Sequence, residues 1–153
     1  MQQFRQTLEH YGPLAARVLL AQVFIVSGFG KLKAFTATAS FMANLGIPAS
    51  QTMLVLTIAL ELGGGILLVL GWQARWLAIA FFGFTFITAV VVHPFWSAEA
   101  QSVGGQLNNF MKNLAIMGGM LYVVIHGPGP LSLGRDSWVE GSAAAKKTSL
   151  KHR

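Results

Sequence analysis

Four long apolar stretches constrain the fold of this 153-residue chain more than any other feature of its sequence. They occupy residues 14–30, 53–70, 76–92 and 110–125, and the third contains no charged residue. A helix of a soluble bundle would carry a polar stripe with a period of 3.6 residues, which the third stretch lacks. A helix of about 17 residues covers about 26 Å, close to the thickness of the hydrocarbon core of a bilayer. We therefore predict an all-α integral membrane protein, built as an antiparallel four-helix bundle.

The composition agrees with this prediction and removes several classes of function. Only 10% of the residues are charged, against about a quarter in soluble domains. The absence of cysteine excludes disulfides, thiol nucleophiles and thiolate-bound clusters. Much of the net charge of +6 comes from residues 137–153, which we expect to form a basic, disordered cytoplasmic tail after a transmembrane domain at residues 1–136. Such a tail indicates contact with anionic membrane lipids rather than with nucleic acid.

The distribution of basic residues predicts the orientation in the membrane. Four spans place both termini on one side together with the arginines, whereas the opposite loops carry Lys31, Lys33 and Lys112. The positive-inside rule then assigns both termini to the cytoplasm. Arg17 lies about one turn inside this face, and we expect its guanidinium to extend to the lipid headgroups.

The segment after the first span predicts a further short helix. Apolar residues recur there at helical spacing, and residues 46–48 end the pattern with a glycine and a proline. We expect an interfacial helix on the outer side of the membrane. This helix could cap a cavity that opens outward, but we favour a helix that floats among the headgroups. The apolar positions are Phe35, Ala39, Met42 and Leu45.

Glu61 is the sharpest candidate for chemistry, because a carboxylate near the middle of a span either finds a partner or takes up a proton. Helical side chains lean toward the N-terminus of their helix, so Glu61 and Lys31 on antiparallel helices can converge. One interpretation makes Glu61 a proton acceptor or a headgroup anchor whose charge Lys31 controls. The other makes the pair a structural lock between helices, close to the glycine run at residues 63–65.

A second polar cluster lies at the outer ends of the third and fourth spans. Pro94 biases His93 away from helical geometry, and a histidine held there near a lysine could donate to a quinone carbonyl or exchange a proton. A polar helix end that meets water is the alternative interpretation. We take Glu61 and His93 as candidate catalytic residues. The predicted pocket in the outer half of the bundle consists of Lys31, Glu61, His93, Lys112 and Asn113.

Haem and metal sites are not expected. Two histidines can share one haem iron only at the same depth in the membrane, but the four-span prediction places His93 and His126 at opposite faces. The histidines and carboxylates also show no spacing that is typical of metal ligands.

Several short motifs follow one another between residues 14 and 136. They are Arg17, FIVSGFGKL at residues 24–32, LGIP at 45–48, ELGGG at 61–65, HPFW at 93–96, NFMKNL at 109–114 and GPGPLSL at 127–133. In this order the motifs resemble the bacterial DoxX family. The resemblance implies a four-helix protein of the inner membrane. It also implies a link to redox chemistry, because some relatives are membrane subunits of a thiosulfate:quinone oxidoreductase and others are linked with oxidative-stress complexes.

Three hypotheses for function remain open. In the first, the chain is a membrane subunit that binds a quinone and works with a soluble or periplasmic redox partner, because it offers hydrogen-bond donors and a carboxylate but no redox centre of its own. In the second, it is a non-enzymatic membrane anchor or assembly factor, and the same polar residues fix helix packing. In the third, it is a small-molecule transporter, which would need an oligomer because four short helices leave little interior space.

Overall fold

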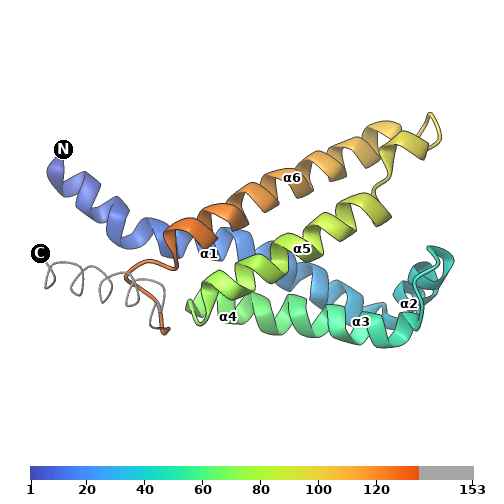
Figure 1. The fold of residues 1–153 in the computed structure, drawn as a ribbon, viewed down its shortest axis with the longest axis horizontal. Coiled ribbons are helices and arrows are strands. Elements are labelled where there is room, and N and C mark those ends of the chain that lie inside the picture. The colour runs from blue at the N-terminus through green and yellow to red at the C-terminus, as the bar shows by residue number, and fades with distance from the viewer. Residues whose placement is uncertain (135–153) are drawn as a thin grey trace, which may run out of the picture.

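The computed structural model describes residues 1–134, which are mostly helical and contain no strand (Figure 1). This confirms the prediction of an all-α chain for the described part. The predicted basic tail, residues 137–153, lies outside the described residues. The helices are α1 (Gln2–Lys33), α2 (Phe35–Asn44), α3 (Ser50–Ile58), the π-helix η1 (Ala59–Gly64), α4 (Gly65–Leu70), α5 (Ala74–Val92), the short 3₁₀-helix η2 (Phe95–Ser97) and α6 (Val103–His126).

Three helical segments are long and apolar enough to cross a membrane, namely Gln2–Lys33, Ser50–Leu70 and Ala74–Ser97. They contain the first three predicted spans. The fourth predicted span, residues 110–125, falls in the last two thirds of α6, which is not among the three segments. Both α1 and α6 begin well before their apolar stretches, because residues such as glutamine and asparagine can extend a helix that is already nucleated.

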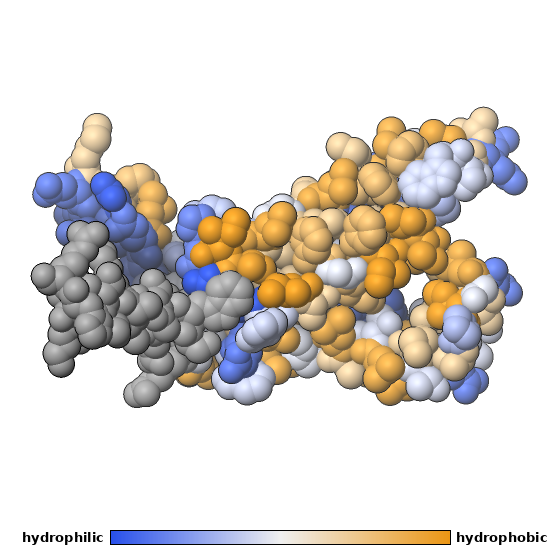
Figure 2. Space-filling model, viewed as in Figure 1, coloured by the Kyte–Doolittle hydropathy of each residue, from blue (hydrophilic) through white to orange (hydrophobic). Residues whose placement is uncertain are grey.

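The helices form two hairpins. α3, η1 and α4 follow one another as a single rod that runs antiparallel to α1, and α5 runs antiparallel to α6 (Figure 1). We call the end with the α4–α5 turn and the last residues of α6 the turn end. The end with α2 and η2 is the loop end. The two hairpins diverge towards the loop end, where the space-filling view shows a recess between them (Figure 2).

An apolar core joins the hairpins. Phe24 of α1 stacks on Phe81 of α5, with ring centroids 4.1 Å apart. Glycine allows close packing inside the first hairpin, because a Cβ on Gly65 would lie only 2.7 Å from Ile25 of α1. The other buried residues of this cluster are Ala21, Leu68, Ala74, Ala78, Ile116, Met120 and Val123.

The predicted helix between the first two spans is present as α2. Its buried Ala39 packs in an apolar cluster with Leu54 and Ile58 of α3, and Phe35 and Met42 border this cluster. Phe35, Ala39 and Met42 therefore share one face of a helix as predicted, whereas Leu45 follows the last residue of α2. This apolar face packs against α3.

Arg17 does not extend to the lipid headgroups, so the prediction for its side chain was wrong. The residue is 1% exposed, and its guanidinium donates to the main-chain oxygens of Leu68 (3.2 Å) and Val69 (2.7 Å) at the end of α4 and to that of Leu131. The last carbonyls of a helix have no partner within it, and a buried guanidinium supplies several donors. Arg75 similarly donates to main-chain oxygens at the end of α6.

Candidate functional site

The helix type changes within the rod that α3, η1 and α4 form. Residues 59–64 form the π-helix η1, which separates α3 from α4. In a π-turn the main-chain hydrogen bonds join residues five apart instead of four apart, and such turns occur frequently at functional sites. Glu61 lies inside this turn and is 2% exposed. The rod therefore changes its register at the point where it carries its buried carboxylate.

Two side chains of α1 meet the Glu61 carboxylate. Lys31 Nζ lies 2.8 Å from Oε1 and 2.9 Å from Oε2, and Ser27 Oγ donates to Oε1 at 3.1 Å. Lys31 Nζ also donates to Ser27 Oγ at 2.5 Å, so the three side chains form a closed network. The side chain of Glu61 is 3% exposed, but that of Lys31 is 26% exposed. The carboxylate is thus more deeply buried than the lysine side chain that pairs with it.

Gly28 allows α1 to approach η1 at this point. A Cβ on Gly28 would lie 3.0 Å from both Glu61 Cβ and Leu62 Cγ. This distance is shorter than ordinary van der Waals contact, so a larger residue would push the helices apart. The close approach places Ser27 and Lys31, on either side of Gly28, within reach of the carboxylate.

Two further polar side chains are buried in the second hairpin. Asn113 of α6 is 7% exposed and Thr85 of α5 is 2% exposed. Within residues 1–134, Asn113 Nδ2 and Thr85 Oγ1 have no hydrogen-bond partner. Unpaired polar groups are costly in a membrane interior, where no bulk water can replace the missing partner. These two atoms are therefore candidates for contact with a ligand.

The helix contacts show which of these residues share a level. The register of α5 and α6 is fixed by the contacts of Arg75 with Ile125 and of His93 with Gln106. Thr85 lies near the middle of the α5 segment between these contacts, and Asn113 lies near the middle of the matching α6 segment. The two residues therefore lie beside each other. A Cβ on Gly64 would lie 3.2 Å from Phe81, so the rod and α5 are in contact at these two residues. Glu61 on η1 lies about one turn from Gly64 towards the loop end, and Thr85 on α5 lies about one turn from Phe81 in the same direction. Glu61, Thr85 and Asn113 therefore lie at about the same depth.

His93 and Lys112 do not join the buried side chains of this layer, although Lys112 directly precedes Asn113 in α6. His93 follows the last residue of α5, two helical turns beyond Thr85, and its Nδ1 is 2.9 Å from Gln106 Oε1. Lys112 is exposed, and its Nζ donates to Asn109 Oδ1 at 2.9 Å. Of the five residues predicted to form one pocket, the structure brings Lys31 and Glu61 into contact and places Asn113 at their depth.

Sequence reasoning missed two members of the layer, Ser27 and Thr85. Ser27 precedes Lys31 by four residues, and this spacing puts both side chains on one face of a helix. It could therefore have been found once Lys31 was chosen. Thr85 carries no such signal, because a threonine in a span commonly bonds to the carbonyl four residues earlier, as Thr88 does with Phe84.

Comparison with known proteins decides the family. The DoxX family model matches residues 12–94, more than half of the chain. The chain belongs to the DoxX family. The match includes all of the Lys31, Ser27 and Glu61 network, whereas α6 and Asn113 of this DoxX protein lie beyond it. The resemblance seen in the sequence motifs is confirmed.

Two relatives of this DoxX protein come from Escherichia coli strain K12. Inner membrane protein YphA is 38% identical over 122 residues, which cover 80% of this chain and 87% of YphA. Inner membrane protein YqjF is 41% identical over 128 residues, or 84% of this chain and 93% of YqjF. The names of these relatives and the apolar helices identify the DoxX protein as a multi-pass protein of the inner membrane.

A third relative carries a name that mentions chemistry. It is the putative oxidoreductase CatD of Bacillus subtilis strain 168, which is 30% identical over 80 residues, or 52% of this chain and 58% of CatD. No solved structure gives a significant match.

Proposed function

We propose that this DoxX protein is a quinone-binding membrane subunit of an oxidoreductase complex. The observation that carries the proposal is the network of Lys31, Ser27 and Glu61, which is buried at its carboxylate and in which the Lys31 side chain is 26% exposed. A quinone offers carbonyl oxygens that accept hydrogen bonds, and the Lys31 ammonium group supplies donors of the matching kind. The name of the relative CatD, a putative oxidoreductase, supports the same class of function.

The proposal includes four membrane spans with both termini in the cytoplasm. α6 follows α5 in an antiparallel hairpin, and its 24 residues extend about 36 Å, which is enough to cross the hydrocarbon core. On this topology the arginines lie on the cytoplasmic side and the loop end faces outward. α2 then lies at the outer surface as an interfacial helix.

The surroundings of the network suit a ligand with a polar head and an apolar tail. The apolar cluster around Leu54 lies on its loop-end side, and the core around Phe24 and Phe81 lies on its turn-end side. Thr85 Oγ1 and Asn113 Nδ2 add two unpaired polar atoms at the same depth. A quinone that enters from the recess between the hairpins could accept hydrogen bonds from both sides. A carbonyl oxygen would replace Ser27 Oγ as an acceptor of Lys31.

The chain contributes binding and proton exchange in this proposal. Reduction of a quinone to a quinol requires two electrons and two protons, and the electrons would come from a redox partner subunit. Lys31 and Glu61 can pass a proton between the ligand and the recess, because both are acid–base groups and share hydrogen bonds with Ser27.

Mass spectrometry of organic extracts tests this function. The protein is purified in mild detergent, and its co-purified quinone is compared with that of the double variant Lys31→Met/Glu61→Gln. We expect about one quinone per wild-type chain and a loss of most of it in the variant. A matched control, Lys33→Met/Glu9→Gln, changes the same residue types at exposed positions and should retain the quinone. Absence of quinone from the wild type would contradict the proposal.

The second candidate is a non-enzymatic membrane anchor or assembly factor. It is favoured by the mutual pairing of Lys31, Ser27 and Glu61, since a closed network can serve helix packing alone. Under this function, single substitutions of Lys31 or Glu61 lower thermal stability, and no quinone accompanies the wild-type protein.

A further inference from the structure

The outward face of α1 carries a repeating pattern that the bundle does not use. Six residues follow one another at alternating spacings of four and three, which is the pattern of the contact positions in a coiled coil. All six are exposed, whereas the buried residues of α1 lie on the other side of the helix. The six residues are Phe4, Leu8, Tyr11, Ala15, Val18 and Gln22.

Gln22 is the unusual member of this face. It lies in the middle of the first apolar stretch, residues 14–30, and its side chain is exposed. Among the described residues, its amide forms no hydrogen bond. An amide that faces hydrocarbon without a partner is costly, so a second helix that offers a donor and an acceptor would stabilise it.

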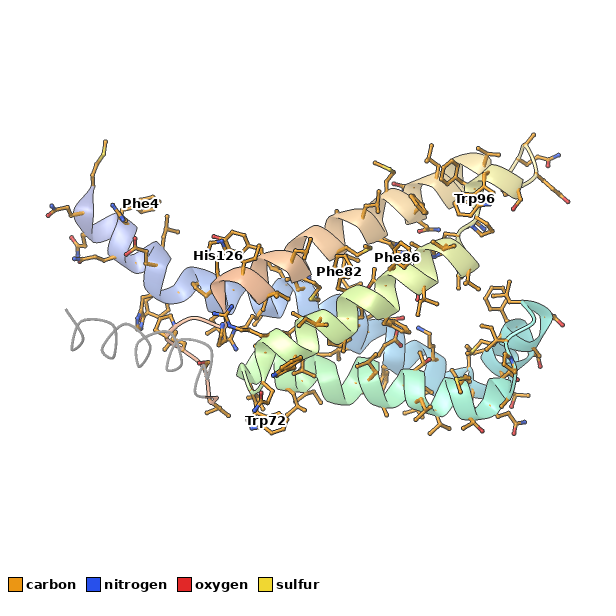
Figure 3. All side chains as sticks on the ribbon, viewed as in Figure 1. Phe4, Trp72, Phe82, Phe86, Trp96 and His126 are labelled. Carbon is orange, nitrogen blue, oxygen red and sulfur yellow. The ribbon has the colours of Figure 1, made fainter. Side chains whose placement is uncertain are left out.

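The length of α1 adds a second observation. Its 32 residues extend about 48 Å, against about 30 Å for the hydrocarbon core, so the first part of the helix projects beyond the core. Figure 3 shows Phe4 near the free end of α1, away from the other helices. Phe4, Leu8 and Tyr11 are 69%, 53% and 58% exposed on this projecting part. A partner helix would shield these side chains from water.

We propose that α1 pairs with α1 of a second copy of this chain, in a parallel coiled coil whose polar layer is formed by the two Gln22 side chains. An amide has both a donor and an acceptor, so two identical glutamines satisfy each other across a twofold axis. Both copies share one orientation in the membrane, which makes the pair parallel. The spacing of four and three residues predicts a left-handed supercoil. The inference does not depend on quinone binding.

Cysteine cross-linking in membranes tests this pairing without background, because the chain has no cysteine. Ala15→Cys and Gln22→Cys should each give a disulfide-linked homodimer on mild oxidation. Ala16→Cys, at an exposed position beside the stripe, and Ile79→Cys, at an exposed position of α5 at a depth similar to that of Gln22, should give at least about tenfold less. Equal cross-linking at all four positions, or cross-linking of Gln22→Cys to a different protein, would overturn the proposal.

The polar layer has its own test. Gln22→Leu should weaken dimerisation of the full-length protein in liposomes by about threefold to thirtyfold, the effect of losing one hydrogen-bonded polar contact between membrane helices. Energy transfer between labelled copies measures this change as the lipid dilution increases. Ile79→Gln, which adds an amide on α5 at a similar depth, should leave dimerisation unchanged. An unaltered dimer in Gln22→Leu would show that Gln22 does not pair with its copy.

Discussion

At the residue scale, the buried carboxylate of Glu61 depends on two partners that both come from α1. Lys31 neutralises its charge through contacts of 2.8 and 2.9 Å, and Ser27 donates to the same oxygen as Lys31. A buried ion pair contributes little net stability as a whole, but the loss of one partner leaves the other charge uncompensated. The convergence of Lys31 and Glu61 could be predicted from the direction of helical side chains. The position of His93 relative to this pair could not be predicted, because it depends on where the second hairpin diverges from the first.

Lys31→Met should therefore destabilise the protein. Breaking a buried pair costs about 3–5 kcal/mol, and we expect a value at the lower end because the Lys31 side chain is 26% exposed. The double variant Lys31→Met/Glu61→Gln removes both charges and should recover most of the stability. Thermal unfolding in detergent measures both effects. Lys33→Met, at an exposed position, should have little effect, and a double variant as unstable as Lys31→Met would contradict the account.

At the element scale, hydrophobic patterning predicted where helices form but not how they deform or end. The apolar stretch at residues 53–70 corresponds well to the rod from Ser50 to Leu70. The hydrophobic pattern does not predict the π-turn at residues 59–64, because the residues on both sides of it are helical and apolar. Within the glycine run, an added Cβ would meet Phe81 at Gly64 and Ile25 at Gly65, whereas at Gly63 it would meet no atom within 4 Å. The deformation of a helix and the contacts of its glycines depend on the residues of other helices that pack against it.

Close approach of α1 to η1 should make Gly28 intolerant of a side chain. Gly28→Val places a Cβ 3.0 Å from Glu61 Cβ and should cost about 1–3 kcal/mol through overpacking. Gly30→Val is the matched control, because no atom lies within 4 Å of a Cβ at this position of the same helix. Thermal unfolding of the two variants gives the comparison, and equal stability would contradict the close contact.

Arg17 should be important for the end of α4. Arg17→Met leaves the carbonyl of Val69 without this donor, whereas that of Leu68 keeps the N–H of Gly71, and an unsatisfied buried group costs about 1–3 kcal/mol. We expect a large fall in the unfolding temperature and faster proteolysis near the α4–α5 turn. Arg5→Met serves as the control, because Arg5 pairs only with exposed Glu9. If Arg17→Met proved as stable as Arg5→Met, the capping role would be wrong.

At the scale of the whole molecule, the chain is two helical hairpins that share a core near the turn end and diverge near the loop end (Figures 1 and 2). The number and order of the helices could be anticipated, since each apolar stretch nucleates one. The divergence of the hairpins could not, because it depends on tertiary contacts such as that between Phe24 and Phe81. His93 lies two helical turns beyond Thr85 along α5 and therefore apart from the Lys31 and Glu61 pair.

The topology predicts which positions an impermeant thiol reagent can reach in intact cells. With both termini in the cytoplasm, Ala100→Cys in the loop after η2 should be labelled from the periplasm. Gln3→Cys should be labelled only after the membrane is permeabilised. The opposite pattern would reverse the orientation. Labelling of both positions in intact cells would contradict the three membrane crossings between them.

The central claim is that the Lys31 and Glu61 pair forms part of a quinone site, and direct titration tests it most closely. Purified protein stripped of lipid is titrated with a short-chain ubiquinone, with tryptophan fluorescence as the readout, and compared with Lys31→Met/Glu61→Gln at a temperature where both are folded. The account predicts saturable binding to the wild type and at least about tenfold weaker binding to the double variant, which corresponds to about 1.4 kcal/mol. Equal affinity of the two proteins, or no saturable binding by the wild type, would contradict it.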